Sequence, residues 1–229
     1  MSQNRRFEYD KGPRLEDEAT PPESDADAAE DERPAPDAGD RRVTVAPWTA
    51  GSVAGVSAFA IVFAAFYQLS TAYAAMGSYG QGDSDPSNWI IAGLTTLANH
   101  GVTIQQGGEP IDGFGMYPVV LVSPVSALLP AVVLLAAGYV LVRYVALETR
   151  REAGLAVGAC CASYVVLASG LAALARWTPD TGTEGMSEGA ITAATDLSLI
   201  VTVGGTVLTF ALIGAGIAAF PRLRPADDE

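Results

Sequence analysis

The 229-residue chain combines 49% hydrophobic residues with a formal net charge of −13. A soluble domain of this length does not mix both properties evenly, so the acidic and the apolar residues must lie in different segments. The excess of acid gives no basic surface for nucleic acid, and we expect no nucleic-acid partner.

The acidic residues gather at the N-terminus, because residues 1–42 hold half of them. This segment is rich in Pro, Ala, Asp and Glu and cannot bury enough apolar surface to offset the entropy cost of ordering. We predict a disordered acidic cytoplasmic tail over 1–42, either simply solvated or bound to a basic partner. A short acidic cytoplasmic tail is predicted over 222–229.

Four uncharged stretches follow the tail. A helix needs about 20 apolar residues to cross a hydrocarbon core of about 30 Å, and each stretch supplies them. The sequence therefore predicts an all-α fold, a four-helix transmembrane bundle over 43–221. The runs lack the alternation of a β-barrel. The predicted spans are about 48–71, 118–142, 153–174 and 199–220, with bends at Pro124 and Pro130 and a stop at Pro221.

Small residues recur at helical spacing in two of these spans. Gly51 and Gly55 lie in "GSVAG" of the first span, and Gly154 and Gly158 lie in "GLAVG" of the third. Such Gly-x-x-x-Gly patterns let helix backbones approach closely where lipid provides no hydrophobic drive. They predict packing within the bundle or, alternatively, association with a second chain.

The long connection over 77–116 contains a short helix predicted at about 88–101, with apolar residues on one side and threonines opposite. We expect an extracellular amphipathic helix that lies on the outer membrane surface or caps the bundle. His100, the only histidine, ends this helix. It is either a hydrogen-bonded structural residue or a group that binds a metal or senses pH. Its possible helpers are Asp83, Asp85, Asn99, Glu109 and Asp112.

Asp196 is the second candidate functional residue, because it lies next to the last span. An ionisable group inside a span suggests ion or proton handling. At the edge of the span it is instead a hydrated acid favoured by the positive end of the helix dipole. Both interpretations remain open at this point.

Positive charge sets the expected orientation. Twelve of the 13 basic residues fall in the N-terminal tail, in the "RYVALETRRE" connection or after the last span. The positive-inside rule then places both termini in the cytoplasm of a multi-pass plasma membrane protein. Arginine outnumbers lysine twelve to one in an acidic chain, which favours a halophilic archaeal source.

The sequence has none of the common catalytic or nucleotide-binding motifs. The sequence contains no nucleophile elbow, phosphate loop, paired histidines or nucleotide fingerprint, and the adjacent Cys160 and Cys161 are interpreted as packing residues. We expect no enzyme, no cofactor and no metal site. The favoured function is a structural or accessory membrane component that packs in the bilayer as a homo-oligomer or in a larger complex. The alternative is a small channel or transporter subunit with Asp196, His100 and the bent second span lining a path.

Gly93 precedes His100 by seven positions in the long connection between the first two of four spans. This arrangement resembles a family of uncharacterised haloarchaeal multi-span membrane proteins, a domain of unknown function, over residues 43–220. The family has aromatic residues and an Asn between its Gly and His. Here residues 94–97 are not aromatic and Asn99 is shifted by one place. The resemblance implies a multi-span helical fold and no assigned activity.

Overall fold

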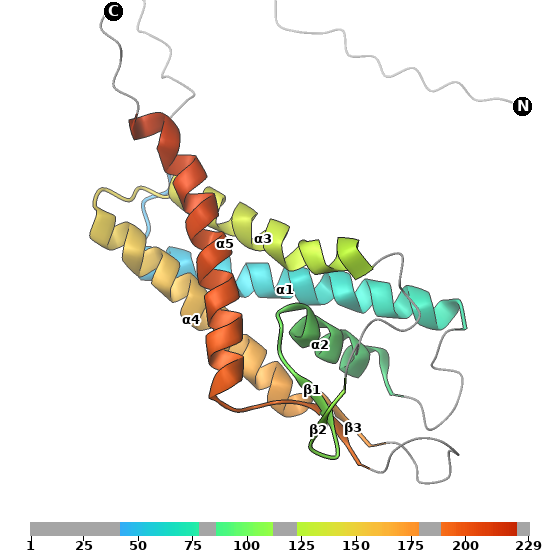
Figure 1. Ribbon diagram of the computed structural model, residues 1–229. Helices are drawn as coiled ribbons and strands as arrows, with labels where there is room; N and C mark the ends of the chain where they lie inside the picture. Colours follow the sequence, from blue (N-terminus) through green and yellow to red (C-terminus); the bar gives the residue numbers. More distant parts are fainter. Residues whose placement is uncertain (1–41, 78–85, 112–122, 179–188, 224–229) are drawn as a thin grey trace, which may run out of the picture. The chain divides into compact units, whose positions relative to one another are not determined.

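A computed structural model describes residues 42–77, 86–111, 123–178 and 189–223, all within one unit, Asp40–Glu229. Five helices and four short strands occur in these ranges (Figure 1). In chain order they are α1 (Pro47–Ala75), α2 (Asn88–Asn99), β1 (Ile104–Gln106), β2 (Glu109–Pro110), α3 (Ser123–Tyr144), α4 (Arg150–Leu174), β3 (Arg176–Trp177), β4 (Ile191–Ala193) and α5 (Leu197–Leu223).

Four of the helices, α1, α3, α4 and α5, are long and apolar enough to cross a membrane, as the uncharged stretches predict. A third or less of each apolar window is buried inside the protein. Large hydrophobic side chains such as Val56, Val132, Val166 and Val201 are instead exposed along all four helices. Water does not tolerate so much contiguous apolar surface, whereas lipid does. These helices fit a membrane protein.

The long helices associate as two close pairs, α1 with α4 and α3 with α5. Gly51 and Gly55 of α1 lie so near α4 that an added Cβ would overlap the carbonyl groups of Ala156 and Cys160. In the α3–α5 pair both helices have a glycine at the contact: Gly138 of α3 lies against Ala211, and Gly214 of α5 lies against Leu135. Close approach of backbones at glycine is a common means of helix packing in lipid.

Gly154 and Gly158 behave differently from the first glycine pair. Within the described ranges, nothing lies within 4 Å of a Cβ added at either position, and both residues are exposed. The expected packing inside the bundle therefore does not occur here. A Gly-x-x-x-Gly pattern shows that small residues share one face of a helix. It does not show which face is buried, because that depends on the neighbouring helix, which lies elsewhere in the sequence.

A small antiparallel sheet joins the two connections at one end of the bundle, in the strand order β2-β1-β4-β3. β1 and β2 form a hairpin whose turn residues, Gly107 and Gly108, have positive φ angles of 60° and 92°. β4 then pairs with β1, with Gln105 opposite Thr192. The expectation of an all-α fold is thus too simple, although the chain is mostly helical. We call this end of the bundle the sheet end.

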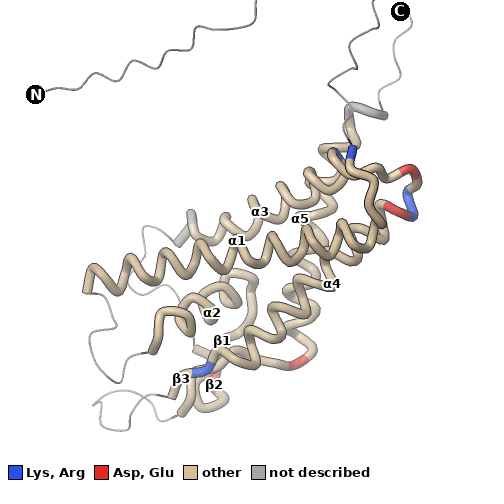
Figure 2. The backbone as a smooth tube through the Cα atoms, turned by 180° about the vertical axis from the view of Figure 1, so that it is seen from behind, with Lys and Arg blue, Asp and Glu red and all other residues tan. Residues whose placement is uncertain are grey.

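The opposite end, which we call the arginine end, contains Arg42, Arg143, Arg150 and Arg151. Figure 2 shows charged residues at the two ends of the helices, with uncharged backbone between them. Here the segment before α1 bonds to the end of α3: the Val43 amide donates to the Tyr144 carbonyl at 2.9 Å. The start of α1 and the end of α3, the first two long helices of the chain, are thereby held together.

Several helix boundaries differ from those predicted: α1, for example, ends at Ala75 and not at about 71. α4 begins at Arg150 and not at about 153, because Thr149 and Glu152 form a capping box that brings the charged residues into the first turn. α5 continues past the predicted stop at Pro221 to Leu223. A proline has no N–H to donate to the carbonyl four residues earlier, but this missing bond does not prevent a further half-turn of helical backbone.

Several predictions lie outside the described residues. These are the tail over residues 1–41, the first residues of the second span over 118–122, the C-terminal residues 224–229, and the possible helpers Asp83, Asp85 and Asp112.

Candidate functional site

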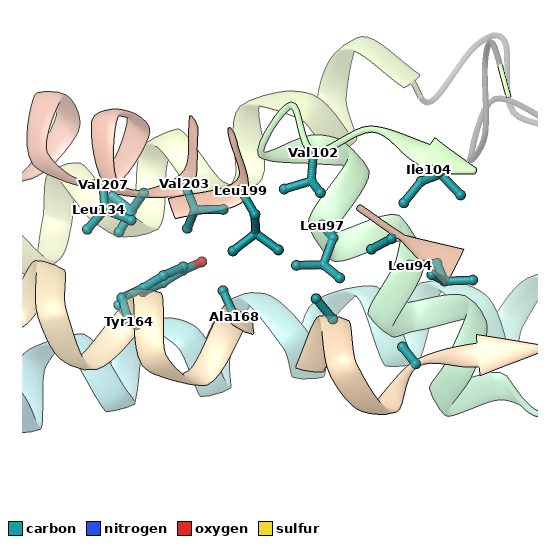
Figure 3. Close-up of a cluster of buried hydrophobic side chains, with 14 of the residues drawn as sticks. Leu94, Leu97, Val102, Ile104, Leu134, Tyr164, Ala168, Leu199, Val203 and Val207 are labelled. Atoms are coloured by element: carbon teal, nitrogen blue, oxygen red, sulfur yellow. The ribbon is translucent and has the colours of Figure 1, made fainter. Parts of the chain in front are cut away.

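α2 is inserted into the sheet end of the bundle and does not lie on its surface. It contacts α1 most, and also α3, α4, β3 and β4, and it lies in the angle between α1 and the neighbouring half of α4 (Figure 1). Its predicted polar side is buried in part: Thr96 is only 1% exposed, whereas Thr95 and Asn99 are partly exposed. Leu94 and Leu97 join Ala168 of α4 and Leu199 of α5 in one buried cluster (Figure 3). Of the two expected positions, on the membrane surface or as a cap on the bundle, the first does not occur: α2 caps the sheet end and is inserted as a wedge between α1 and α4.

His100 lies at the inner tip of this wedge and is 3% exposed. Its Nδ1 atom is 2.7 Å from the carbonyl oxygen of Thr96, and its Nε2 atom is 2.8 Å from the hydroxyl of Tyr164 on α4. The two rings lie 5.4 Å apart, centroid to centroid. The structure therefore pairs His100, which the sequence analysis singled out, with Tyr164, which it did not.

The two partners determine the tautomer of His100. A carbonyl oxygen only accepts hydrogen bonds, so Nδ1 must carry a proton and donate to Thr96. In the neutral imidazole Nε2 is then a lone-pair acceptor, and the hydroxyl of Tyr164 donates to it. Both polar groups of this buried pair are satisfied, in the neutral form of the histidine.

Tyr164 lies deep in the bundle. It is fully buried, and the ring of Phe59 on α1 meets its ring edge-on, with centroids 5.2 Å apart and planes at 83°. At 1.5 Å per residue, it lies about 15 Å along the axis from the last residue of α4, Leu174. Figure 3 shows its hydroxyl directed toward the side on which Leu97 of α2 lies. His100 thus reaches well below the end of the span.

The seven-residue spacing from Gly93 to His100 matches a seven-residue spacing on α4. A Cβ at Gly93 would lie 3.0 Å from Cδ1 of Leu171, and His100 bonds Tyr164. The two helices run antiparallel. Gly93 therefore meets Leu171, and His100, two turns later on α2, meets Tyr164, two turns earlier on α4. This spacing serves the docking of α2 and gives the motif a structural meaning.

Burial lowers the pKa of His100 below its ordinary 6.5, and its bond to the Thr96 carbonyl opposes this effect only in part. Because docking lowers the pKa of this histidine, its contribution to the stability of the docked state is complete at pH values above the ordinary pKa. The contribution is lost as the pH falls from the ordinary pKa toward the lowered pKa of the docked state. The histidine is therefore neutral at neutral pH, in agreement with its hydrogen bonds.

Asp196 lies apart from this pair, immediately before α5. Its carboxylate accepts hydrogen bonds from the amide of Ser198, at 3.0 Å, and from the Ser198 hydroxyl. These bonds, the hydroxyl bond first, lower the pKa of the fully exposed carboxyl group. The geometry is that of an N-terminal helix cap, which favours the hydrated-acid interpretation over ion handling.

Replacing Asp196 separates its two possible roles. Asn caps helices as well as Asp does, whereas Ala does not. We expect Asp196→Asn to leave the first turn of α5 as protected from hydrogen exchange as in the parent chain, and Asp196→Ala to accelerate exchange in residues 197–200. Equal loss of protection in both variants would show that the charge, and not the cap, is what matters.

The other possible helpers of His100 have partners or positions of their own. The side-chain amide of Asn99 donates to the Thr95 carbonyl at 2.8 Å, and Glu109 lies on the exposed strand β2. In the ranges that the structure describes, no three residues of the types that bind metals come together. The partner that sequence reasoning missed, Tyr164, had one available signal: a polar hydroxyl in the middle of an uncharged span, where a hydrogen-bond partner is needed.

These features define a class of protein: a helical bundle with four candidate membrane spans, into which a short helix with a buried His–Tyr pair is inserted. The chain belongs to a family of unknown function, DUF7978, whose sequence pattern matches residues 30–222. No curated protein matches the chain. No solved structure matches it either.

Proposed function

We propose that this protein is a structural or accessory component of the plasma membrane that associates with a second membrane helix through α4. The observation that carries the proposal is an outward-facing row of small residues along α4. Gly154, Gly158 and Ala162 are exposed and recur every four positions, so they share one face of the helix. Val166, the next position in this row, is 69% exposed, and Gly170 is exposed further along α4.

The contrast with α1 supports this assignment. Gly51 and Gly55 are used within the chain, because they lie against the backbone of α4. Gly154, Gly158 and Gly170 leave open space at the position of a Cβ, at least among the described residues. A surface of this kind lets another helix approach as closely as α1 approaches on the other side. A second copy and a different membrane protein both fit it.

The proposal includes an orientation. The arginine end faces the cytoplasm, since the "RYVALETRRE" connection and both terminal segments contain most of the basic residues. The sheet end, with α2, then faces outward. The acidic, lysine-poor composition supports a halophilic archaeal source. No catalytic activity, cofactor or metal is part of this function.

The alternative function, a small channel or transporter subunit, requires His100 and Asp196 to line one path. Each has separate partners, Tyr164 and Ser198, and Asp196 is fully exposed whereas His100 is buried. These observations do not favour a shared path. We therefore retain the accessory function as the proposal.

The proposal is tested by replacing the open glycines of α4. We expect Gly154→Leu/Gly158→Leu to weaken association about tenfold or more, because leucine side chains hold the partner helix away. The protein is purified in mild detergent from its native host, and its assembly size and its co-purifying partners are measured by native mass spectrometry.

Gly205→Leu/Gly216→Leu on α5 is the matched control, because these glycines are equally exposed and open but lie on another helix. The control is expected to assemble like the parent chain. A monomer without partners in the parent chain, or equal assembly in all three forms, contradicts the proposal.

A further inference from the structure

We propose that α2 is a proton-released wedge: it stays docked between α1 and α4 while the His100 imidazole is neutral, and acid releases it from the bundle. This device is independent of the proposed association through α4. It rests on the hydrogen bonds, the burial and the position of one side chain.

Protonation places two donors opposite each other. In the docked state Nδ1 already donates to the Thr96 carbonyl and Nε2 accepts from Tyr164. A second proton on Nε2 then points at the hydroxyl that donates to it. The hydroxyl of Tyr164 must turn to accept, and its own proton then loses the acceptor that it had in His100. An imidazolium at this place is buried without a satisfied hydrogen-bond network.

No neighbouring acid compensates for that charge in the described chain. Besides Tyr164, the titratable and charged groups on the helices and strands that pack against α2 are Tyr67, Tyr73, Tyr139, Arg143, Tyr144, Arg150, Arg151, Glu152, Cys160, Cys161 and Arg176. Glu152 is the only carboxylate among them, and it lies twelve residues before Tyr164, about 18 Å away along α4. Asp196 and Glu109, on the neighbouring segments, are exposed. An unpaired buried charge is costly, so the protonated histidine favours release.

The rest of the wedge permits release at its tip. After His100 the chain turns at Gly101, which is exposed and has a φ of 84°, and returns to β1. At the other end of α2, the hydroxyl of Ser70 on α1 lies 3.2 Å from the Asn88 carbonyl and 3.0 Å from that of Tyr67, so this bond is shared. The His100–Tyr164 bond is therefore a direct polar link at the deep end of α2. The lowered pKa of His100 agrees with a docked state that disfavours the proton.

Hydrogen exchange of the full chain in lipid nanodiscs tests the wedge. The matched variant is His100→Gln, whose side-chain oxygen still accepts from Tyr164 but does not titrate. Comparing parent and variant at the same pH cancels the intrinsic effect of pH on exchange. We expect similar exchange in residues 90–102 at about pH 7.5, and about tenfold or more faster exchange in the parent chain at about pH 5. Residues 203–211 of α5 serve as the internal reference and should not differ.

Equal ratios of parent to variant exchange at both pH values overturn the proposal. A parallel measurement needs no variant: the chain has one histidine, so its imidazole resonances need no assignment. The imidazole titration and the loss of α2 protection are expected to share one midpoint, below the ordinary pKa of histidine. Protonation of His100 while α2 stays protected from hydrogen exchange would also overturn the proposal.

Discussion

Replacing Gly55 by leucine is expected to separate α1 from α4 and to leave little folded protein. A Cβ at this position would overlap both the Ser163 side chain and the Cys160 carbonyl. Backbone atoms cannot move away as a flexible side chain can, so the helices must part along their whole contact. The loss of stability is expected to be about 3 kcal/mol or more, the upper end of the range for overpacked cores.

The measurement is unfolding in mixed micelles, followed by circular dichroism. Gly205→Leu is the control, because nothing lies within 4 Å of a Cβ at Gly205 in the described ranges. It adds the same side chain to a long helix without changing a contact. An unfolding midpoint of Gly55→Leu equal to that of the control would show that α1 and α4 do not pack in this way.

Removing the hydroxyl of Tyr164 is expected to have the second largest effect. Tyr164→Phe keeps the ring and its edge-on contact with Phe59 but leaves Nε2 of the buried His100 without a donor. The expected cost at neutral pH is about 1–2 kcal/mol, since side-chain hydrogen bonds within membrane helices are of this size or smaller.

A double-mutant cycle with His100→Leu isolates the bond itself. If the two residues act through their hydrogen bond, the second substitution costs less in the presence of the first. Purely additive losses would mean that the two side chains do not interact. The cycle is measured near neutral pH, where the imidazole is neutral, and so does not depend on release of α2 by acid.

The four long helices could be predicted because the property that makes them is local. Each contains an uncharged apolar run long enough for a bilayer, and length and charge are read directly from the sequence. The ends of these helices were harder to predict. The prediction treated Arg150 and Arg151 as part of a loop, although "TRRE" contains the Thr149 and Glu152 of a capping box.

The sheet was missed for a different reason. Its strands have two or three residues, too short for an alternating pattern. One local signal was present, because "TIQQGGEPI" places two glycines between short segments, a typical sequence for a two-residue hairpin turn. The pairing of β1 with β4 had no such signal, since it joins segments from two different connections.

The candidate site was half predictable. His100 stands out as a single histidine near the end of a short helix, and the short helix itself was expected. Periodicity, however, separates apolar from polar residues and does not show whether a polar residue meets water or a partner. Thr96 bonds the Ala92 carbonyl at 2.7 Å and His100 bonds Tyr164, which is why both are buried. The position of α2 depends on a residue that is 64 positions away.

The pairing of β1 with β4 has a consequence for biosynthesis. β1 precedes α3 in the chain, whereas its partner β4 follows α4. A ribosome therefore delivers β1 to the membrane well before the strand that completes the sheet, and the edge that β4 will occupy stays open meanwhile. Open strand edges recruit other chains. The interval between the emergence of these two strands is thus the stage of biogenesis at which the nascent protein is most exposed to misassembly.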